Sequence, residues 1–235
     1  MGKFTVTANH IGNTEDIPLK TMVALKTYDY IITEYPELLE HELSQIQVKP
    51  VGKLIRYSGK ALKNFNYQEI IDYVNNDKNV LFIVERGMPG FADPGSVLVN
   101  RLTEAKVDID VIPGPGIVQT AIAVSGLRYE SNNIFSMGTF TSTLDQIKEE
   151  LTVIKNINSY ILVCDRPNRT KEILELMLSA FNENRPVSIC IDLSLPTQKI
   201  INGDYISLID LLGSTEITGF VTIVSTGIDH KKFAL

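Results

Sequence analysis

Short runs of apolar and β-branched residues alternate along the chain with segments in which apolar residues recur every three or four positions. The runs are typical of strands buried on both faces, and the spaced segments are typical of helices with one face on a sheet. In the first half of the chain, strands are expected at five runs: Phe4–Ala8, Tyr30–Thr33, Lys53–Tyr57, Val80–Val84 and Val107–Ile112. Helices are expected between several of them, at Leu19–Lys26, Tyr67–Asn75 and Ser96–Ala105. This alternation predicts an α/β fold with a mainly parallel sheet.

The tetrapeptide Pro113-Gly114-Pro115-Gly116 breaks any regular element, and the alternation resumes after it. Further strands are expected at Ile134–Met137, Tyr160–Cys164, Val187–Ile191, Lys199–Ile201 and Phe220–Val224. Helices are expected at Ile117–Val124, Leu144–Ile154, Lys171–Phe181 and Tyr205–Leu212. Several of these strands follow one another closely enough to form hairpins, which favours a mixed sheet. We therefore expect two α/β domains, residues 1–114 and 115–235.

The segment 87–95 reads Gly-Met-Pro-Gly-Phe-Ala-Asp-Pro-Gly, directly after a buried strand and before a helix. A turn between such elements needs only a few residues. Three glycines and two prolines instead fix an unusual backbone path and keep side chains away from it. In open α/β sheets ligands bind at this carboxyl edge of the strands, so the segment predicts a binding loop. The alternative is an elaborate loop without a ligand.

The composition is that of a soluble globular protein, with 44% hydrophobic and 21% charged residues among 235. A net charge of −6 argues against a broad electrostatic surface for nucleic acid. The candidates for a local basic cluster are Arg56, Lys60 and Lys63 in the segment Lys53–Lys63, with Arg166 and Arg169 across the cleft. Tyr57 and Phe65 would offer aromatic surfaces for an exposed base. The alternative is that these residues are solvated charges on a loop.

The titratable residues suggest neither a metal site nor a catalytic triad. The three histidines are scattered and no Cys-x-x-Cys occurs; Cys164 and Cys190 read as buried thiols in neighbouring strands. His10 is the one imidazole within a candidate loop, and its ring is expected to face solvent. No signal peptide and no apolar run of membrane-spanning length is seen, so a cytoplasmic protein without membrane contact is expected.

Two charged residues lie near the starts of predicted helices. Asp93 precedes Pro94-Gly95 and a helix, so an N-cap role is expected first and a ligand contact second. Arg169 lies near a helix start, where the helix dipole does not favour a cation. It is therefore expected to pair with Asp165 or to contact an anionic substrate.

A series of loop motifs recurs in a fixed order along the chain and resembles one known family. The matching segments are Ile11-Gly12-Asn13, Glu34, Gly87 with Pro89-Gly90 and Asp93-Pro94-Gly95, Pro113-Gly114-Pro115, Ser125-Gly126-Leu127, Pro167 with Arg169, Arg185-Pro186 and Gly203. The series resembles the tetrapyrrole methylase superfamily of S-adenosylmethionine-dependent methyltransferases. Within it, the chain looks most similar to the ribosomal RNA small subunit methyltransferase I kind, which methylates a cytidine ribose 2′-hydroxyl.

The chain departs from that family's pattern mainly on the substrate side. A basic segment after the second strand is replaced by the acidic Tyr35-Pro36-Glu37-Leu38-Leu39-Glu40. The usual Asp-Ala-Gly-Thr-Pro becomes Glu85-Arg86-Gly87-Met88-Pro89, and the usual Pro-Gly-Pro-Ser-Ala becomes Pro113-Gly114-Pro115-Gly116-Ile117. The methyl-donor motifs are mostly retained, whereas the substrate side differs. The resemblance therefore supports methyl transfer as the chemistry more strongly than it supports a particular acceptor.

The resemblance implies two α/β domains with S-adenosylmethionine bound in the cleft between them, and a homodimer. The donor contacts that it implies are Ile11, Gly87, Met88, Pro89, Phe91, Gly116, Ile117, Val163, Cys164, Leu193 and Phe220. Small-subunit ribosomal RNA is the expected partner. A small molecule, tetrapyrrole or peptide acceptor stays open, as does a non-catalytic binding protein, which Ile117 in place of Ala favours. The catalytic base is unknown; Asp93 and Glu34 are the only carboxylates near the predicted loops.

Overall fold

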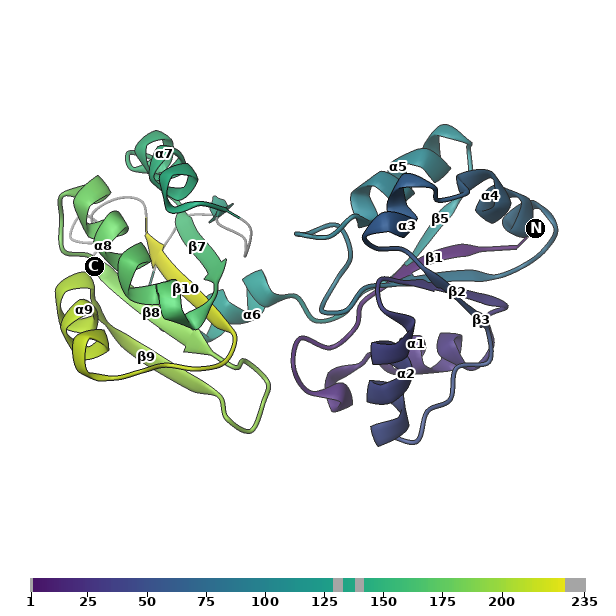
Figure 1. Ribbon diagram of the computed structural model, residues 1–235, viewed down its shortest axis with the longest axis horizontal. Coiled ribbons are helices and arrows are strands. Elements are labelled where there is room, and N and C mark those ends of the chain that lie inside the picture. Colours follow the sequence, from purple (N-terminus) through teal and green to yellow (C-terminus); the bar gives the residue numbers. More distant parts are fainter. Residues whose placement is uncertain (1, 129–132, 138–141, 227–235) are drawn as a thin grey trace. The chain divides into compact units, whose positions relative to one another are not determined.

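The computed structural model describes residues 2–128, 133–137 and 142–226 of the chain. It separates into two compact units, Met1–Gly116 and Ile117–Leu235. Each unit has a five-stranded sheet and its own hydrophobic core (Figure 1).

The sheet of the first unit is parallel, as the sequence predicts. Its strands are β1 (Phe4–Thr7), β2 (Tyr30–Thr33), β3 (Lys53–Arg56), β4 (Val80–Ile83) and β5 (Ile109–Ile112), in the order β3-β2-β4-β1-β5. β1 and β4 are buried along their whole length, because helices cover both faces of the sheet.

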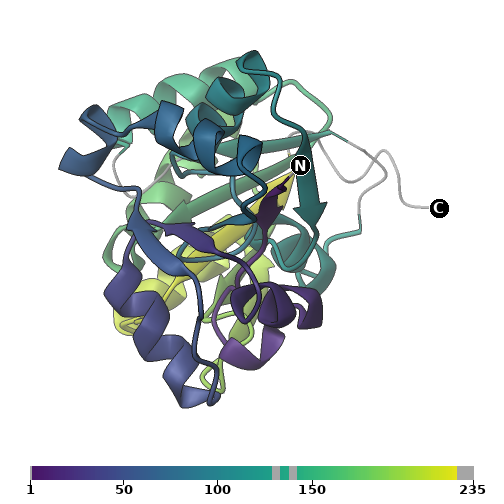
Figure 2. The ribbon, with the colours of Figure 1, turned by 90° about the vertical axis from the view of Figure 1, so that its right-hand side faces the viewer.

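Two layers of helices cover this sheet (Figures 1 and 2). α1 (Leu19–Leu25) and α2 (Pro36–Gln45) lie on one face, and α3 (Lys60–Lys63), α4 (Tyr67–Asn75) and α5 (Gly95–Glu104) on the other. Successive side chains of β4 pack alternately against the two helix layers. Leu81 and Ile83 pack with the α1 and α2 residues, while Val80 and Phe82 pack with those of α4 and α5.

The chain changes face at β4. The connections from β1 to β2 and from β2 to β3 run through α1 and α2, whereas those before and after β4 run through the opposite layer. Because β4 lies between β2 and β1, the loop after it leaves toward the other face from the loops of both neighbours. Such a reversal opens a crevice at the carboxyl ends of the strands, where α/β folds bind ligands.

Two helices of this unit were not expected from the sequence. One of them is Pro36–Gln45, which overlaps the acidic segment Tyr35–Glu40. Pro36 begins this helix, and the helix buries Leu39 and Leu43. Lys60–Lys63 is a short helix rather than part of a loop. The expected aromatic surface at Tyr57 is also wrong, because this side chain is fully buried in the core and cannot stack on a base.

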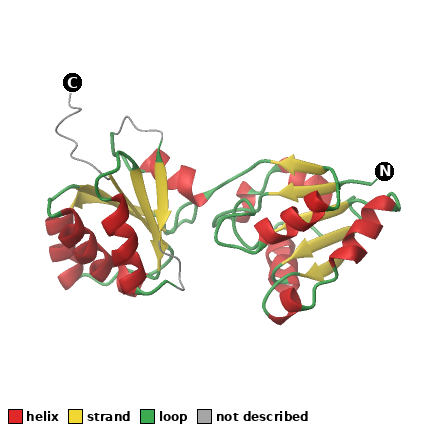
Figure 3. Cartoon of the chain, turned by 90° about the horizontal axis from the view of Figure 1, so that it is seen from above, coloured by secondary structure: helices red, strands yellow, loops and turns green. Residues whose placement is uncertain are grey.

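The second unit has the mixed sheet that its closely spaced strands predict (Figure 3). β6 (Ile134–Met137) pairs in parallel with β7 (Tyr160–Asp165), and the remaining pairs are antiparallel. The other strands are β8 (Pro186–Ile191), β9 (Lys199–Asp204) and β10 (Val221–Thr226), in the order β6-β7-β10-β8-β9.

Three helices pack on one face of this sheet: α7 (Leu144–Ile154), α8 (Thr170–Phe181) and α9 (Tyr205–Ser214). α6 (Ile117–Val124) lies on the other face, where the Cys190 thiol is 3.9 Å from the Ala121 carbonyl oxygen. Two short 3₁₀ helices, Thr14–Asp16 and Pro167–Arg169, complete the described elements. The two cysteines are not in adjacent strands, because β10 lies between β7 and β8.

Candidate functional site

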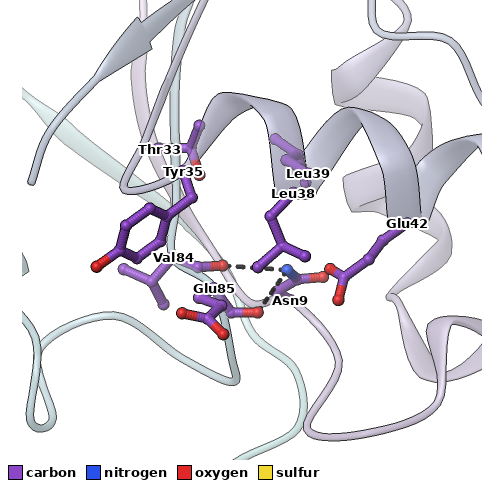
Figure 4. Close-up of a pocket in the computed structure, with 8 residues that line it drawn as sticks. All are labelled: Asn9, Thr33, Tyr35, Leu38, Leu39, Glu42, Val84 and Glu85. Carbon is purple, nitrogen blue, oxygen red and sulfur yellow. Dashed lines mark hydrogen bonds between the residues drawn. The ribbon is translucent and has the colours of Figure 1, made fainter.

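The loop after β1 and the glycine-rich loop after β4 are joined by their main chains. Asn9 N donates to Gly87 O at 2.9 Å, and Gly87 N donates to His10 O at 2.8 Å. The buried Asn9 side chain adds hydrogen bonds from Nδ2 to the Val84 and Glu85 carbonyls, at 3.1 and 2.9 Å (Figure 4). The two loops therefore behave as one structural element at the carboxyl edge of the sheet.

Gly87 is the point where this element comes closest to the chain before α6. Its φ of +69° is a conformation that side-chain-bearing residues rarely adopt. A Cβ atom built there would lie 3.5 Å from Ile11 Cγ2 and from Pro115 O, and 3.9 Å from Gly116 Cα. The structure thus brings together Ile11, Gly87 and Gly116, three of the residues that the sequence predicts to contact the donor.

Asp93 shapes the rest of the glycine-rich loop. Its carboxylate accepts main-chain hydrogen bonds from Gly90, Phe91 and Gly95, at 2.6 to 3.0 Å. Burial raises the pKa of Asp93, and these hydrogen bonds oppose the increase. The N-cap of α5 is Pro94, so the predicted cap role is wrong in detail, although Asp93 does satisfy the first helical N–H.

The loop that Asp93 holds presents bare backbone and apolar side chains. Nothing lies within 4 Å of a Cβ built on Gly90, and the Phe91 side chain is 45% exposed. Met88 is half-buried against the core, and Pro89 beside it is half-buried too. Accessible main-chain groups next to apolar side chains suit a ligand with both polar edges and apolar surface, such as S-adenosylmethionine.

In the second unit the predicted donor residues gather at one end of the sheet. Val221 at the start of β10 is in register with Asp165 at the end of β7 and with Ile191 at the end of β8. Cys164, Leu193 and Phe220 adjoin these three positions. Asp192 joins the loop after β8 to the chain just before β10. Its Oδ1 accepts from Phe220 N at 2.8 Å, and its own N–H donates to Phe220 O at 2.9 Å.

The side chains of this second group are placed unequally. Phe220 is 59% exposed and Ile117, at the start of α6, is half-buried, whereas Leu193 is buried. Val163 is fully buried among the residues of α7 and α8, which leaves only its main chain for a ligand. Burial raises the pKa of the Cys164 thiol, so this group stays protonated and unreactive at neutral pH.

Two further expectations about single residues can be compared with the structure. The His10 ring is buried rather than facing solvent, with Nε2 3.2 Å from a Glu42 carboxylate oxygen. Arg169 does pair with Asp165, at 3.3 Å. In the described ranges, no group of three His, Cys, Asp or Glu side chains could hold a metal ion. In the same ranges, no helix is long and apolar enough to cross a membrane.

Asn9, Glu42 and Arg86 were not among the residues predicted to form the site. Asn9 lies in the predicted loop after the first strand, and Arg86 stands where the resembling family has Ala, so both carried a weak signal. Glu42 carried none, because it looks like any acidic residue of a helix until its burial is known.

Comparison with known proteins gives matches over most of the chain. The family model described as Tetrapyrrole (Corrin/Porphyrin) Methylases matches residues 11–207. The ribosomal RNA small subunit methyltransferase I of Thermotoga maritima is 26% identical over 97% of this chain and 99% of its own. The protein of the same name from Coprothermobacter proteolyticus is 30% identical over 71% of this chain and 74% of its own.

A solved structure has the same fold. Uroporphyrin-III C-methyltransferase from Thermus thermophilus, complexed with S-adenosyl homocysteine, has a TM-score of 0.65 and 16% identity, and the match covers 96% of this chain and 97% of that one.

Replacing Gly87 with Leu is expected to abolish S-adenosylmethionine binding, because the side chain would fill the space between Ile11 and Gly116. The positive φ alone should cost about 1 kcal/mol of stability. Gly59→Leu is the matched control, since Gly59 has a φ of +54° but nothing within 4 Å of its Cβ position. Calorimetric titration with the donor is the measurement. A folded Gly87→Leu variant that binds like the parent would show that this loop is not the donor site.

Proposed function

The chain belongs to the tetrapyrrole methylase family, and from this premise we propose that it methylates ribosomal RNA of the small ribosomal subunit. Membership confirms the predicted class, an S-adenosylmethionine-dependent methyltransferase. One observation supports the acceptor: relatives matching nearly the whole chain are named ribosomal RNA small subunit methyltransferase I. Residues of the proposed donor site remain those that the sequence predicted.

Methyl transfer places modest chemical demands on the protein. The sulfonium of the donor supplies a methyl carbon that is already activated for in-line displacement. The chain has to align that carbon with the acceptor atom and exclude water, which can provide much of the reduction in the barrier. Gly87 and Ile11 are held for this purpose by the main-chain hydrogen bonds of Asn9 and Gly87, and Gly116 Cα lies 3.9 Å from a Cβ position built on Gly87.

A ribose hydroxyl must also lose its proton during the transfer. Asp93 is poorly suited to accept it, because its carboxylate already receives hydrogen bonds from three main-chain N–H groups. Glu34, at the end of β2, is less constrained. Its Oε2 accepts from Glu85 N at 3.2 Å, and no described residue donates to its other oxygen.

Glu34 also has the electrostatic surroundings of a proton acceptor. Burial raises its pKa, the hydrogen bond from Glu85 N opposes the increase, and the negative charges of Asp93 and Glu85 raise the pKa further. A raised pKa makes the carboxylate a stronger base. We therefore propose Glu34 as the group that receives the hydroxyl proton.

Only some of the basic residues predicted to contact RNA are available for it. Arg56 Nη2 contacts the Glu37 carboxylate and Nη1 donates to Glu34 O at 3.3 Å, so its charge is largely engaged. Lys53 on β3 and Lys63 on α3 are exposed, and Arg166 is exposed on a loop of the second unit. We propose Lys53 and Lys63 as the phosphate contacts of the first unit.

Methyl transfer from labelled S-adenosylmethionine to isolated small ribosomal subunits is the expected activity. Reversing the charge of both lysines, Lys53→Glu with Lys63→Glu, should lower both the labelling and the dependence of labelling on salt concentration. With fewer phosphate contacts, RNA binding releases fewer counterions. Lys148→Glu, an exposed lysine on α7, is the charge-matched control. Unchanged labelling would remove the cluster from the RNA surface. A parent that binds the donor but does not label the subunits would favour a small-molecule, tetrapyrrole or peptide acceptor.

Glu34→Gln is expected to lower the rate of labelling by about 10²-fold or more, because general-base catalysis contributes that much. Donor affinity should stay unchanged. With the parent enzyme, the rate should rise with pH as the Glu34 carboxyl loses its proton, over a range above that of an ordinary glutamate. The variant should lack this rise. A variant that keeps the parental rate and pH profile would exclude Glu34 as the base.

We also propose that the protein is a homodimer and acts in the cytoplasm, where ribosomal subunits are found. The dimer rests on the family resemblance, and a two-fold interface is the commonest arrangement. Light scattering at micromolar protein should give twice the mass of one chain. The mass of a single chain would reject the dimer.

A further inference from the structure

Three titratable side chains from separate elements meet beneath the proposed donor loops. His10 lies in the loop after β1, Glu42 on α2 and Arg86 in the loop after β4. Glu42 Oε2 is 3.2 Å from His10 Nε2, and Glu42 Oε1 is 2.8 Å from Arg86 Nη2. The His10 side chain is 1% exposed, that of Glu42 10% and that of Arg86 32%.

Glu42 is ionised in this position. Burial has the largest effect and would raise its pKa, but the hydrogen bonds and charges of His10 and Arg86 together hold the pKa below the usual value. A buried carboxylate is costly unless its oxygens are paired, and here each oxygen has one partner. Replacing the carboxylate by an amide leaves one acceptor oxygen for two donors, so either the buried His10 ring or the Arg86 guanidinium loses its partner.

Each partner of Glu42 is adjacent to a residue of the proposed donor surface. His10 precedes Ile11 and Arg86 precedes Gly87. The main chains of the same two segments are joined by the hydrogen bonds Asn9 N to Gly87 O and Gly87 N to His10 O. Glu42 thus contacts both loops from a third element and ties their relative position to α2.

Direct participation of Glu42 in the reaction does not fit its contacts. Both carboxylate oxygens are occupied and the side chain is nearly buried. The adjacent hollow is lined by Asn9, Thr33, Tyr35, Leu38, Leu39, Glu42, Val84 and Glu85 (Figure 4). Asn9 crosses this hollow to the Val84 and Glu85 carbonyls, which leaves little space for a ligand.

We propose that Glu42 is a positioning residue for the methyl donor, acting through His10 and Arg86 to hold the two donor loops at the spacing that binding requires. This inference rests on the proposed donor site at Gly87 and Ile11. It is independent of the role of Glu34, and its calorimetric test requires no acceptor.

The test compares Glu42→Gln with Glu40→Gln, an exposed glutamate on the same helix. Glutamine keeps the volume but carries no charge and has an NH₂ group where one carboxylate oxygen accepted. We expect donor affinity to fall about tenfold or more in Glu42→Gln, because a small displacement of loops has effects of this size. Glu40→Gln should bind like the parent. Calorimetry with S-adenosylmethionine, on protein shown to be folded by circular dichroism, gives both values.

Kinetics separate positioning from a simple loss of stability. If Glu42 positions the loops, the KM for the donor rises while kcat at saturating donor changes little. If it only stabilises the fold, the active fraction and hence kcat fall at unchanged KM, and the proposal is overturned. Arg86→Met removes only the more exposed partner, so it tests the same contact should Glu42→Gln fail to fold. We expect weaker donor binding from this variant too.

The outcomes distinguish this inference from the donor assignment. A parent that does not bind S-adenosylmethionine overturns both. A parent that binds, with binding abolished by Gly87→Leu but unchanged in folded Glu42→Gln or Arg86→Met, overturns the positioning role alone.

Discussion

The first unit depends on one topological constraint, the position of β4 between β2 and β1. The loop after β4 must leave toward the face opposite to the loops of both neighbours, so the edge of the sheet would open there without further contacts. The two main-chain hydrogen bonds between Asn9, His10 and Gly87 close part of that opening. They require an N–H and a C=O from the same glycine, in a conformation with φ of +69°. Any residue except proline could supply these two groups, but the positive φ favours glycine at this position.

Local pattern was enough to predict the strands and most helices, because burial on both faces produces runs such as Val80–Val84. The mixed sheet followed from strand spacing in the same way. The pattern failed at Pro36–Gln45, where charged residues between Leu39 and Leu43 concealed the apolar face of the helix. It failed also for the contacts of Glu42, whose partners lie 32 and 44 positions away in the sequence. Such contacts are set by the topology of the sheet and leave no periodic signal.

Two of the departures from the family pattern introduce residues that form ion pairs. Arg86 replaces Ala in the loop after β4, and its Nη2 lies 2.8 Å from Oε1 of Glu42 on α2. The acidic segment Tyr35–Glu40 replaces a basic one, and Glu37 within it contacts Arg56 of β3. An exposed pair such as the second contributes little to stability, but it does withdraw Arg56 from other partners. In both cases a charge that departs from the family pattern makes an ion pair between elements of the first unit.

Backbone strain marks the same loops independently. Seven described residues other than glycine have positive φ, and four of them (Gln47, Asp77, Lys106 and Asn182) lie at helix ends, where this conformation is common. The other three are Ala92, Asp192 and Ser194, in the loops after β4 and β8. An aspartate holds each loop: Asp93 accepts from three main-chain N–H groups, and Asp192 accepts from Phe220 N and Thr197 Oγ1. Strained conformations persist only where neighbouring contacts enforce them, and they concentrate at binding sites. Both units thus use a carboxylate to keep a loop in a conformation that the chain alone would not adopt.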